Sequence, residues 1–87
     1  MKQLRRYWFT FEKSSNPTPL NLGCGVTAFD YEDALSLLRE RVFIKEPLPT
    51  IIHHIGDIDV STLEKNHVFP NMGLVTDRGI WFPLGYN

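Results

Sequence analysis

The sequence has little of what disulfide frameworks, membranes and polyanionic partners require. Its single cysteine, Cys24, cannot form an intrachain disulfide, whereas secreted domains of this size usually carry several. No apolar run approaches the ~20 residues that span a bilayer, and the N-terminal MKQLRRYW lacks the apolar core of a signal peptide. Nine basic against ten acidic residues leave no basic excess for a nucleic acid or an anionic membrane surface. These absences predict a cytoplasmic protein that does not bind membranes and for which nucleic acid is an unfavoured partner.

What is present supports one folded domain. The 87 residues are 43% hydrophobic and 13% aromatic, which is enough apolar surface for a core and excludes a disordered chain. A chain of this length makes one domain, spanning residues 1–87, rather than two. No glycine-rich phosphate loop, internal repeat or linker is found, and no motif indicates a cofactor.

The segment from residue 30 to residue 43 carries the strongest signal for a helix. Asp30 stands at the N-cap position, and Arg39 and Arg41 lie near the other end, where the helix dipole favours positive charge. The apolar residues recur at helical spacing: Tyr31, Ala34, Leu35, Leu37, Leu38 and Val42. The pattern predicts an amphipathic helix that packs on a sheet.

Alternating and β-branched segments supply that sheet. Strands are expected at residues 3–12, 22–29 and 50–56 and in a C-terminal hairpin that joins 74–76 to 80–82 through a loop at 77–79. Alternation assigns Phe9 and Phe11 to the core and Trp8 to the opposite face, half exposed or under a loop. Gly23 and Gly25 indicate a bulge or a close backbone approach in the second strand.

The segment 50–56, TIIHHIG, is expected to lie inside the sheet. Ile51 and Ile55 share one face and Ile52 lies on the other, and apolar residues on both faces favour a strand with neighbours over a free edge. A turn with one short helical turn is expected at 57–63, capped by Asp59 or Ser61.

The predicted fold is therefore a single α+β domain with one main helix packed on a mixed four- or five-stranded sheet. The element order is β-β-α-β-β-β. This order favours a β-grasp-like arrangement, with a half-ferredoxin-like sheet as the alternative.

One candidate reactive or metal site combines Cys24, His53, His54 and Asp57. Cys24 between two glycines resembles a nucleophile on a tight turn, but it needs a base and a positive environment to form a thiolate. The two histidines are adjacent on a strand, so they point to opposite faces and cannot chelate one ion together. A core thiol explains Cys24 more simply, and the histidines are explained if one is packed in the core or hydrogen-bonded at its rim and the other lies on the surface. No catalytic residue and no metal ligand is therefore assigned, and this site remains the alternative.

A second alternative is single-stranded nucleic-acid binding through the N-terminal strand. Such binders stack bases on aromatic side chains beside positive charge. The residues that fit this description are Lys2, Arg5, Arg6, Tyr7, Trp8 and Phe9. The acidic remainder of the chain argues against this interpretation, and the rings are expected to be core.

The C-terminal GIWFPLGY predicts a protein contact or a cover for the core. Its apolar residues are nearly consecutive, so one short strand cannot turn all of them inward: Ile80, Trp81, Phe82, Leu84 and Tyr86. Two or three exposed rings would form the kind of patch that marks a protein interface. In the other interpretation, Trp81 and Tyr86 close the open side of a small core.

Two segments, GCGVTAFDYEDALSLL at 23–38 and NHVFPN followed by RGIWFPLG within 66–85, resemble a family of short uncharacterised bacterial proteins. The resemblance implies a bacterial cytoplasmic protein and carries no catalytic or binding residue. The residues predict a small protein-binding or accessory module. It would act on a protein partner or as a homodimer through the C-terminal aromatics, with the proline-rich residues 16–20 as a further contact.

Overall fold

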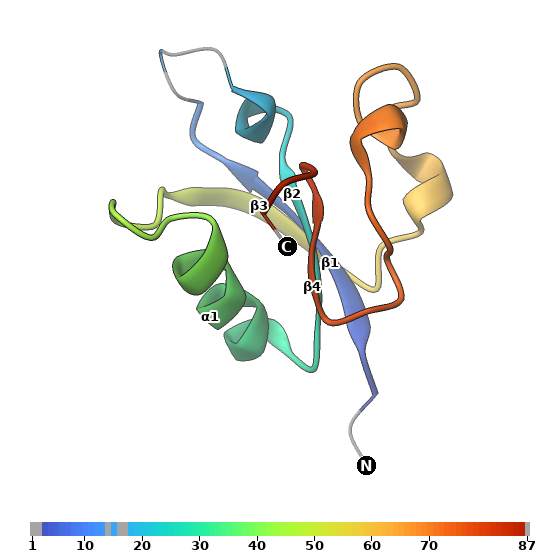
Figure 1. The fold of residues 1–87 in the computed structure, drawn as a ribbon, viewed down its shortest axis with the longest axis horizontal. Coiled ribbons are helices and arrows are strands. Elements are labelled where there is room, and N and C mark those ends of the chain that lie inside the picture. The colour runs from blue at the N-terminus through green and yellow to red at the C-terminus, as the bar shows by residue number, and fades with distance from the viewer. Residues whose placement is uncertain (1–2, 14, 16–17, 87) are drawn as a thin grey trace.

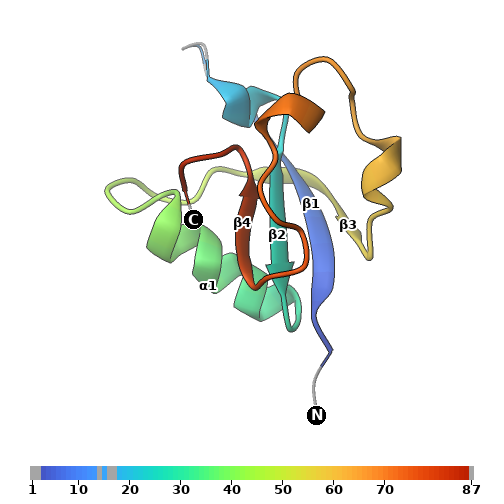
Figure 2. The same cartoon turned by 45° about the vertical axis from the view of Figure 1, so that its right-hand side comes forward.

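Four strands and one helix form an α+β fold in the computed structural model, which describes residues 3–13, 15 and 18–86. The sheet has the order β3-β1-β2-β4, as Figure 2 shows, and its strands are β1 (Arg5–Phe11), β2 (Cys24–Ala28), β3 (Ile51–Gly56) and β4 (Gly79–Phe82). The helix is α1 (Tyr31–Arg41), and short 3-10 turns lie at Pro19–Asn21, Val60–Thr62 and Phe69–Asn71.

Every pair of neighbouring strands is antiparallel, which differs from the predicted mixed sheet. β2 and β3 flank the helix in the chain and run in the same direction, but β1 lies between them and pairs with both. The second difference is the C-terminal hairpin. Residues 74–76 form no strand, so β4 has no partner from them and the sheet has four strands. The observed sheet is fully antiparallel in the order β3-β1-β2-β4, so it is not the mixed sheet of the predicted β-grasp-like arrangement.

Helix α1 begins and packs as its sequence predicts. The Asp30 carboxylate accepts the backbone N–H of Asp33 at 2.8 Å, which confirms the N-cap. The buried face consists of Ala34, Leu35, Leu37 and Leu38. Figure 1 shows the helix against one face of the sheet, where it packs with β2 and β4 over a core that contains Phe9, Phe11 and Val26.

A second core lies on the opposite face of the sheet. Trp8 is 8% exposed there, and its ring centroid is 5.9 Å from that of Trp81 and 5.5 Å from that of Phe82. The segment 57–78 covers these rings with Ile58, Leu63 and Val68. It includes the expected short turn, capped by Asp59. The prediction that Trp8 lies under a loop is confirmed.

The two glycines of the β2 region allow the indole rings to touch the backbone. A Cβ atom at Gly25 would overlap the Trp81 ring, and one at Gly23 would overlap the Trp8 ring. Gly23 also has a φ of 135°, which side chains rarely adopt. The register shifts between Gly25 and Val26, so both the bulge and the close approach are confirmed.

Candidate functional site

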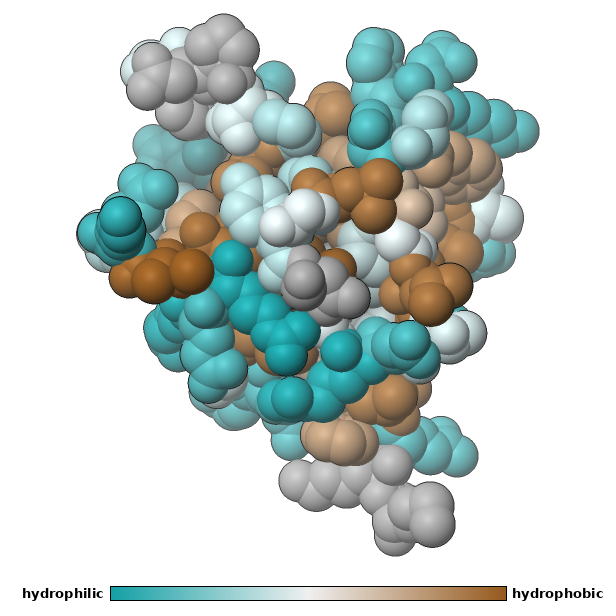
Figure 3. All heavy atoms as spheres, in the orientation of Figure 1, coloured by the Kyte–Doolittle hydropathy of each residue, from teal (hydrophilic) through white to brown (hydrophobic). Residues whose placement is uncertain are grey.

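The structure places most of the predicted C-terminal contact residues in the core. Ile80, Trp81 and Phe82 are at most 1% exposed, so the expectation of an exposed patch is wrong for these three. The reason is that β4 has a covered face on each side: Ile80 joins the helix-side core, and the two rings join the second core. Leu84 is exposed and Tyr86 is half-buried. Figure 3 shows separate apolar patches on this face rather than one continuous surface.

The candidate reactive site is not assembled. Cys24 is fully buried, and burial raises the pKa of its thiol, so the nucleophilic thiolate is disfavoured. Phe9 pairs with Cys24 on one side and with His54 on the other, so the phenylalanine stands between thiol and imidazole. The His54 ring instead lies 4.7 Å from the Tyr31 ring, between centroids.

The remaining members of that site are equally dispersed. His53 pairs with Thr10 and therefore lies on the sheet face opposite to His54. The Asp57 carboxylate accepts from the Arg5 guanidinium at 3.5 Å. Within residues 3–13, 15 and 18–86, no three His, Cys, Asp or Glu side chains are placed to hold a metal ion.

The N-terminal strand offers no free ring for base stacking. Tyr7, Trp8 and Phe9 are all buried, as the alternative assignment to the core predicts. Arg5 and Arg6 are exposed, and Lys2 lies outside the described residues. Without exposed aromatics, the arginines alone carry no signature of a single-stranded nucleic-acid binder.

The β3 strand is the first of two surfaces with functional potential, and its environment corrects a prediction. In the part of the chain that the structure describes, it has β1 as its sole neighbour, although its sequence predicts an interior strand. Ile52 is 62% exposed and Ile55 is 39% exposed, and His53 and His54 are exposed between them. Among the described residues, the backbone hydrogen bonds of this strand and its flanks go to the β1 side. The outer edge of β3 is therefore open.

The opposite edge, along β4, is covered by the chain itself. The Gly73 N–H donates to the Trp81 carbonyl at 2.7 Å, and the Leu84 N–H donates to the Asn71 carbonyl at 3.0 Å. The buried Thr27 hydroxyl donates to the Val75 carbonyl at 2.6 Å and fixes the covering segment to β2. As far as the structure describes the chain, these residues therefore cover the edge at β4.

Nothing in β3 guards it against pairing with another strand. Natural sheet edges usually carry charged residues, prolines or strong bulges that prevent addition of a further strand. The segment 50–56 contains no Lys, Arg, Asp, Glu or Pro. The described pairing with β1 shows one register shift, between Thr10 and Phe11.

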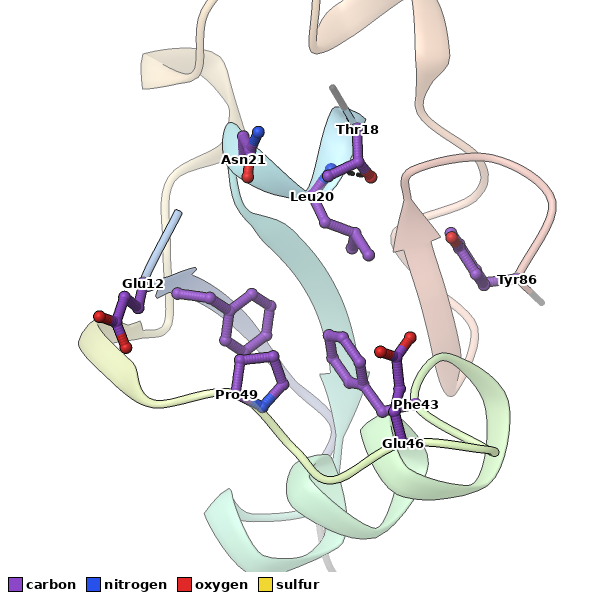
Figure 4. A pocket seen from close by; sticks show the side chains of 9 residues that line it. Glu12, Thr18, Leu20, Asn21, Phe43, Glu46, Pro49 and Tyr86 are labelled. Carbon is purple, nitrogen blue, oxygen red and sulfur yellow. Dashed lines mark hydrogen bonds between the residues drawn. The ribbon is translucent and has the colours of Figure 1, made fainter. Parts of the chain in front are cut away.

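A cavity of about 300 Å³ is the second surface with functional potential. The rings of Phe11 and Phe43 meet edge to face at 5.3 Å and line it. Figure 4 shows the side chains of Leu20 and Glu46 directed into this space, with Tyr86 beside it. The described lining residues are Phe11, Glu12, Thr18, Leu20, Asn21, Phe43, Glu46, Pro49 and Tyr86. Of these, Tyr86 and the two members of the segment 16–20 belong to predicted contacts, but the cavity itself was not predicted, because its lining comes from separate segments of the chain that no local pattern connects.

Thr18 and Leu20 belong to the proline-rich segment 16–20 of the predicted contact, of which residues 16 and 17 lie outside the described residues.

None of the described helices has the length and apolar character needed to cross a bilayer. Comparisons with family models, with curated proteins and with solved structures find no match to this chain.

Proposed function

We propose that this protein is a self-associating interaction module. In the dimer, β3 of one copy pairs with β3 of a second copy, and two four-stranded sheets become one continuous sheet across a two-fold axis. The observation that carries the proposal is the open, apolar and uncharged outer edge of β3. The contact surface thus moves from the C-terminal aromatics to the strand that follows the helix.

The sequence of β3 supports this assignment because it has the character of an interior strand. Ile52 and Ile55 leave apolar surface in water, and each buried Å² of such surface contributes roughly 25 cal/mol. A partner strand would cover part of both side chains and would satisfy the outward backbone N–H and C=O groups. The interior-strand sequence of β3 is consistent with its position at the edge of the sheet if a strand of another chain pairs with it.

A second copy is the partner that the charge of this edge favours. A two-fold contact places the same surface patch on both subunits, so a charged strand would face its own charge. Residues 50–56 carry no Lys, Arg, Asp or Glu, so this repulsion is absent when the histidines are neutral. Antiparallel pairing of a strand with its own copy also continues the antiparallel order of the sheet.

The test is sedimentation analysis across a concentration series. The wild-type protein should sediment with twice the monomer mass at high concentration and should dissociate on dilution. Ile52→Lys places a charge at the exposed edge and should shift the protein to monomer at every concentration. Leu74→Lys is the matched control, because Leu74 is 69% exposed and lies in no strand. It should leave the dimer unchanged.

Amide hydrogen exchange locates the contact. Outward-facing amides of β3 should be protected at high concentration and should lose that protection on dilution, whereas amides of β2 should not change. A wild-type protein that stays monomeric at millimolar concentration contradicts the proposal. Equal weakening of the dimer by Ile52→Lys and by Leu74→Lys also contradicts the proposal.

A further inference from the structure

The cavity lined by Phe11 and Phe43 has the features of a site for a small molecule. Its volume of about 300 Å³ falls at the lower end of the range for ligand pockets, which are mostly apolar with a few polar groups. The apolar lining consists of the two phenylalanine rings, Leu20, Pro49 and the ring of Tyr86. No residue of β3 lines the cavity, so the inference does not rest on self-association.

The charge of the lining is negative. Glu12 and Glu46 are its only ionisable carboxylates, and no Lys, Arg or His lines it among the described residues. Lys13 and Lys45 are next to these glutamates in the sequence but do not line the cavity. An anionic ligand would meet two like charges, whereas a cationic ligand would meet two opposite ones.

Several other carboxylates near turns and helix ends have a partner, and the described residues supply none for these two glutamates. Asp33 accepts from Arg78, and Glu64 accepts from the backbone N–H of Asn66. Among the described residues, neither Glu12 nor Glu46 accepts a hydrogen bond or joins an ion pair. In Figure 4 the Glu46 carboxylate is directed into the cavity, whereas Glu12 lies to one side with its carboxylate directed away from the other lining side chains.

We propose that this cavity binds a small organic monocation, an amine or guanidine carried on an apolar chain or ring. The apolar part would lie between Leu20 and the rings of Phe43 and Tyr86. The cationic group would be placed at the Glu46 carboxylate, beside ring faces that attract positive charge. Specificity for the cation comes from charge, and affinity comes from the apolar lining.

Three probes of nearly the same shape separate these contributions: 3-phenylpropylamine, 3-phenylpropan-1-ol and 3-phenylpropanoate. Their binding is followed by two-dimensional amide NMR of the whole chain. The amine should bind roughly fivefold more tightly than the alcohol, as expected for one partly exposed ion pair. The carboxylate should bind most weakly. The shifted amides should be those of the cavity lining.

Paired variants identify the residue responsible. Glu46→Gln should reduce the affinity for the amine to that for the alcohol, and it should leave the affinity for the alcohol unchanged. Glu40→Gln is the matched control, because Glu40 is exposed on α1 and does not line the cavity. Tyr86→Ala should lower the affinity for all three probes. The amide spectrum of each free variant shows that it is folded.

Four results would overturn the inference. The first is no binding of the amine at ten millimolar, and the second is equal binding of amine, alcohol and carboxylate. The third is equal loss of amine affinity in Glu46→Gln and Glu40→Gln. The fourth is a set of shifted amides outside the cavity. Ile52→Lys should bind the amine as the wild type does, so failure of the dimer and failure of the cavity are distinguishable.

Discussion

The β4 edge of the sheet is covered by the chain itself, whereas the β3 edge is uncovered. Beside β4, Gly73 donates to the Trp81 carbonyl, and Val75 accepts from the buried Thr27. Along β3, the exposed side chain of Ile52 borders a backbone with no partner strand on its outer side among the described residues. An irregular segment thus satisfies one edge as a strand would, and the other edge keeps its pairing capacity.

The cover at β4 also creates a second core. The same segment, residues 57–78, brings Ile58, Leu63 and Val68 over Trp8 and Trp81. Changes at the covered edge should therefore lower the free energy of unfolding. Changes at the open edge should alter association and leave the fold of the monomer nearly as stable.

The largest difference is expected for one glycine from each side of the sheet. Gly25→Ala should lower the free energy of unfolding by about 2–3 kcal/mol, because its Cβ would overlap the Trp81 ring in a filled core. Trp81 has no hydrogen bond from its Nε1 among the described residues, so packing alone sets the ring position. Gly56→Ala should change the free energy of unfolding by less than about 0.5 kcal/mol, because the added Cβ would lie 3.6 Å from the Tyr7 ring.

Urea denaturation of both variants measures this difference. Equal midpoints for Gly25→Ala and Gly56→Ala would contradict a Trp81 ring held tightly on β2. A large loss for Gly56→Ala would show that the β3 edge is packed more tightly than its exposure indicates.

The features that were predictable from sequence depend on local physics. The Asp30 cap and the spacing of Leu35 and Leu38 act within a few residues, so they identify α1 and its buried face. The alternation of the first strand separates Phe9 from Trp8 and places the two rings in different cores.

The features that were missed depend on which segments meet. An apolar pattern reports that a strand could be covered, but not that a neighbour exists in the same chain, so β3 was placed inside the sheet. Residues 74–76 alternate like a strand, yet the Val75 carbonyl bonds the Thr27 side chain instead of a strand ladder. The cavity could not be predicted from the sequence because Leu20, Phe43 and Tyr86 come together only in the folded chain.

A smaller difference is expected between one ion pair from each side. Arg78 donates to Asp33 through both Nε, at 2.9 Å, and Nη2, and its guanidinium lies 5.7 Å from the centroid of the Phe29 ring. Arg5 makes one contact with Asp57, at 3.5 Å, and both side chains are more than half exposed. Arg78→Gln should therefore cost about 1 kcal/mol of stability and Arg5→Gln about 0.3 kcal/mol or less.

Salt separates this electrostatic effect from a packing effect. The loss in Arg78→Gln should shrink in 1 M NaCl, because the Debye length falls to about 3 Å. If the two arginine variants are equally stable at low salt, the pair with Asp33 does not fasten the covering segment to α1.

The smallest effect concerns carboxylates that hold the turns of the cover, for which β3 has no counterpart. The pKa of Asp59 is lowered chiefly because the Ser61 hydroxyl donates to it, and that of Glu64 chiefly because the Asn66 N–H does. A carboxylate whose pKa is lower in the folded state than in the unfolded chain stabilises the fold. Its contribution to the free energy of unfolding is fully present above the unfolded-state pKa of about 4 and is lost as the pH falls through the folded-state pKa.

The combined change Asp59→Asn and Glu64→Gln should therefore flatten the fall in unfolding free energy between neutral pH and pH 3. Asp77→Asn is the control, because the structure gives this exposed carboxylate no hydrogen bond among the described residues. Urea titrations at each pH measure the slope. Parallel pH profiles for the wild type and the double variant would mean that these turns contribute nothing to the cover. The closure of the β4 edge would then depend on its apolar contacts and on the backbone hydrogen bonds at Gly73 and Leu84.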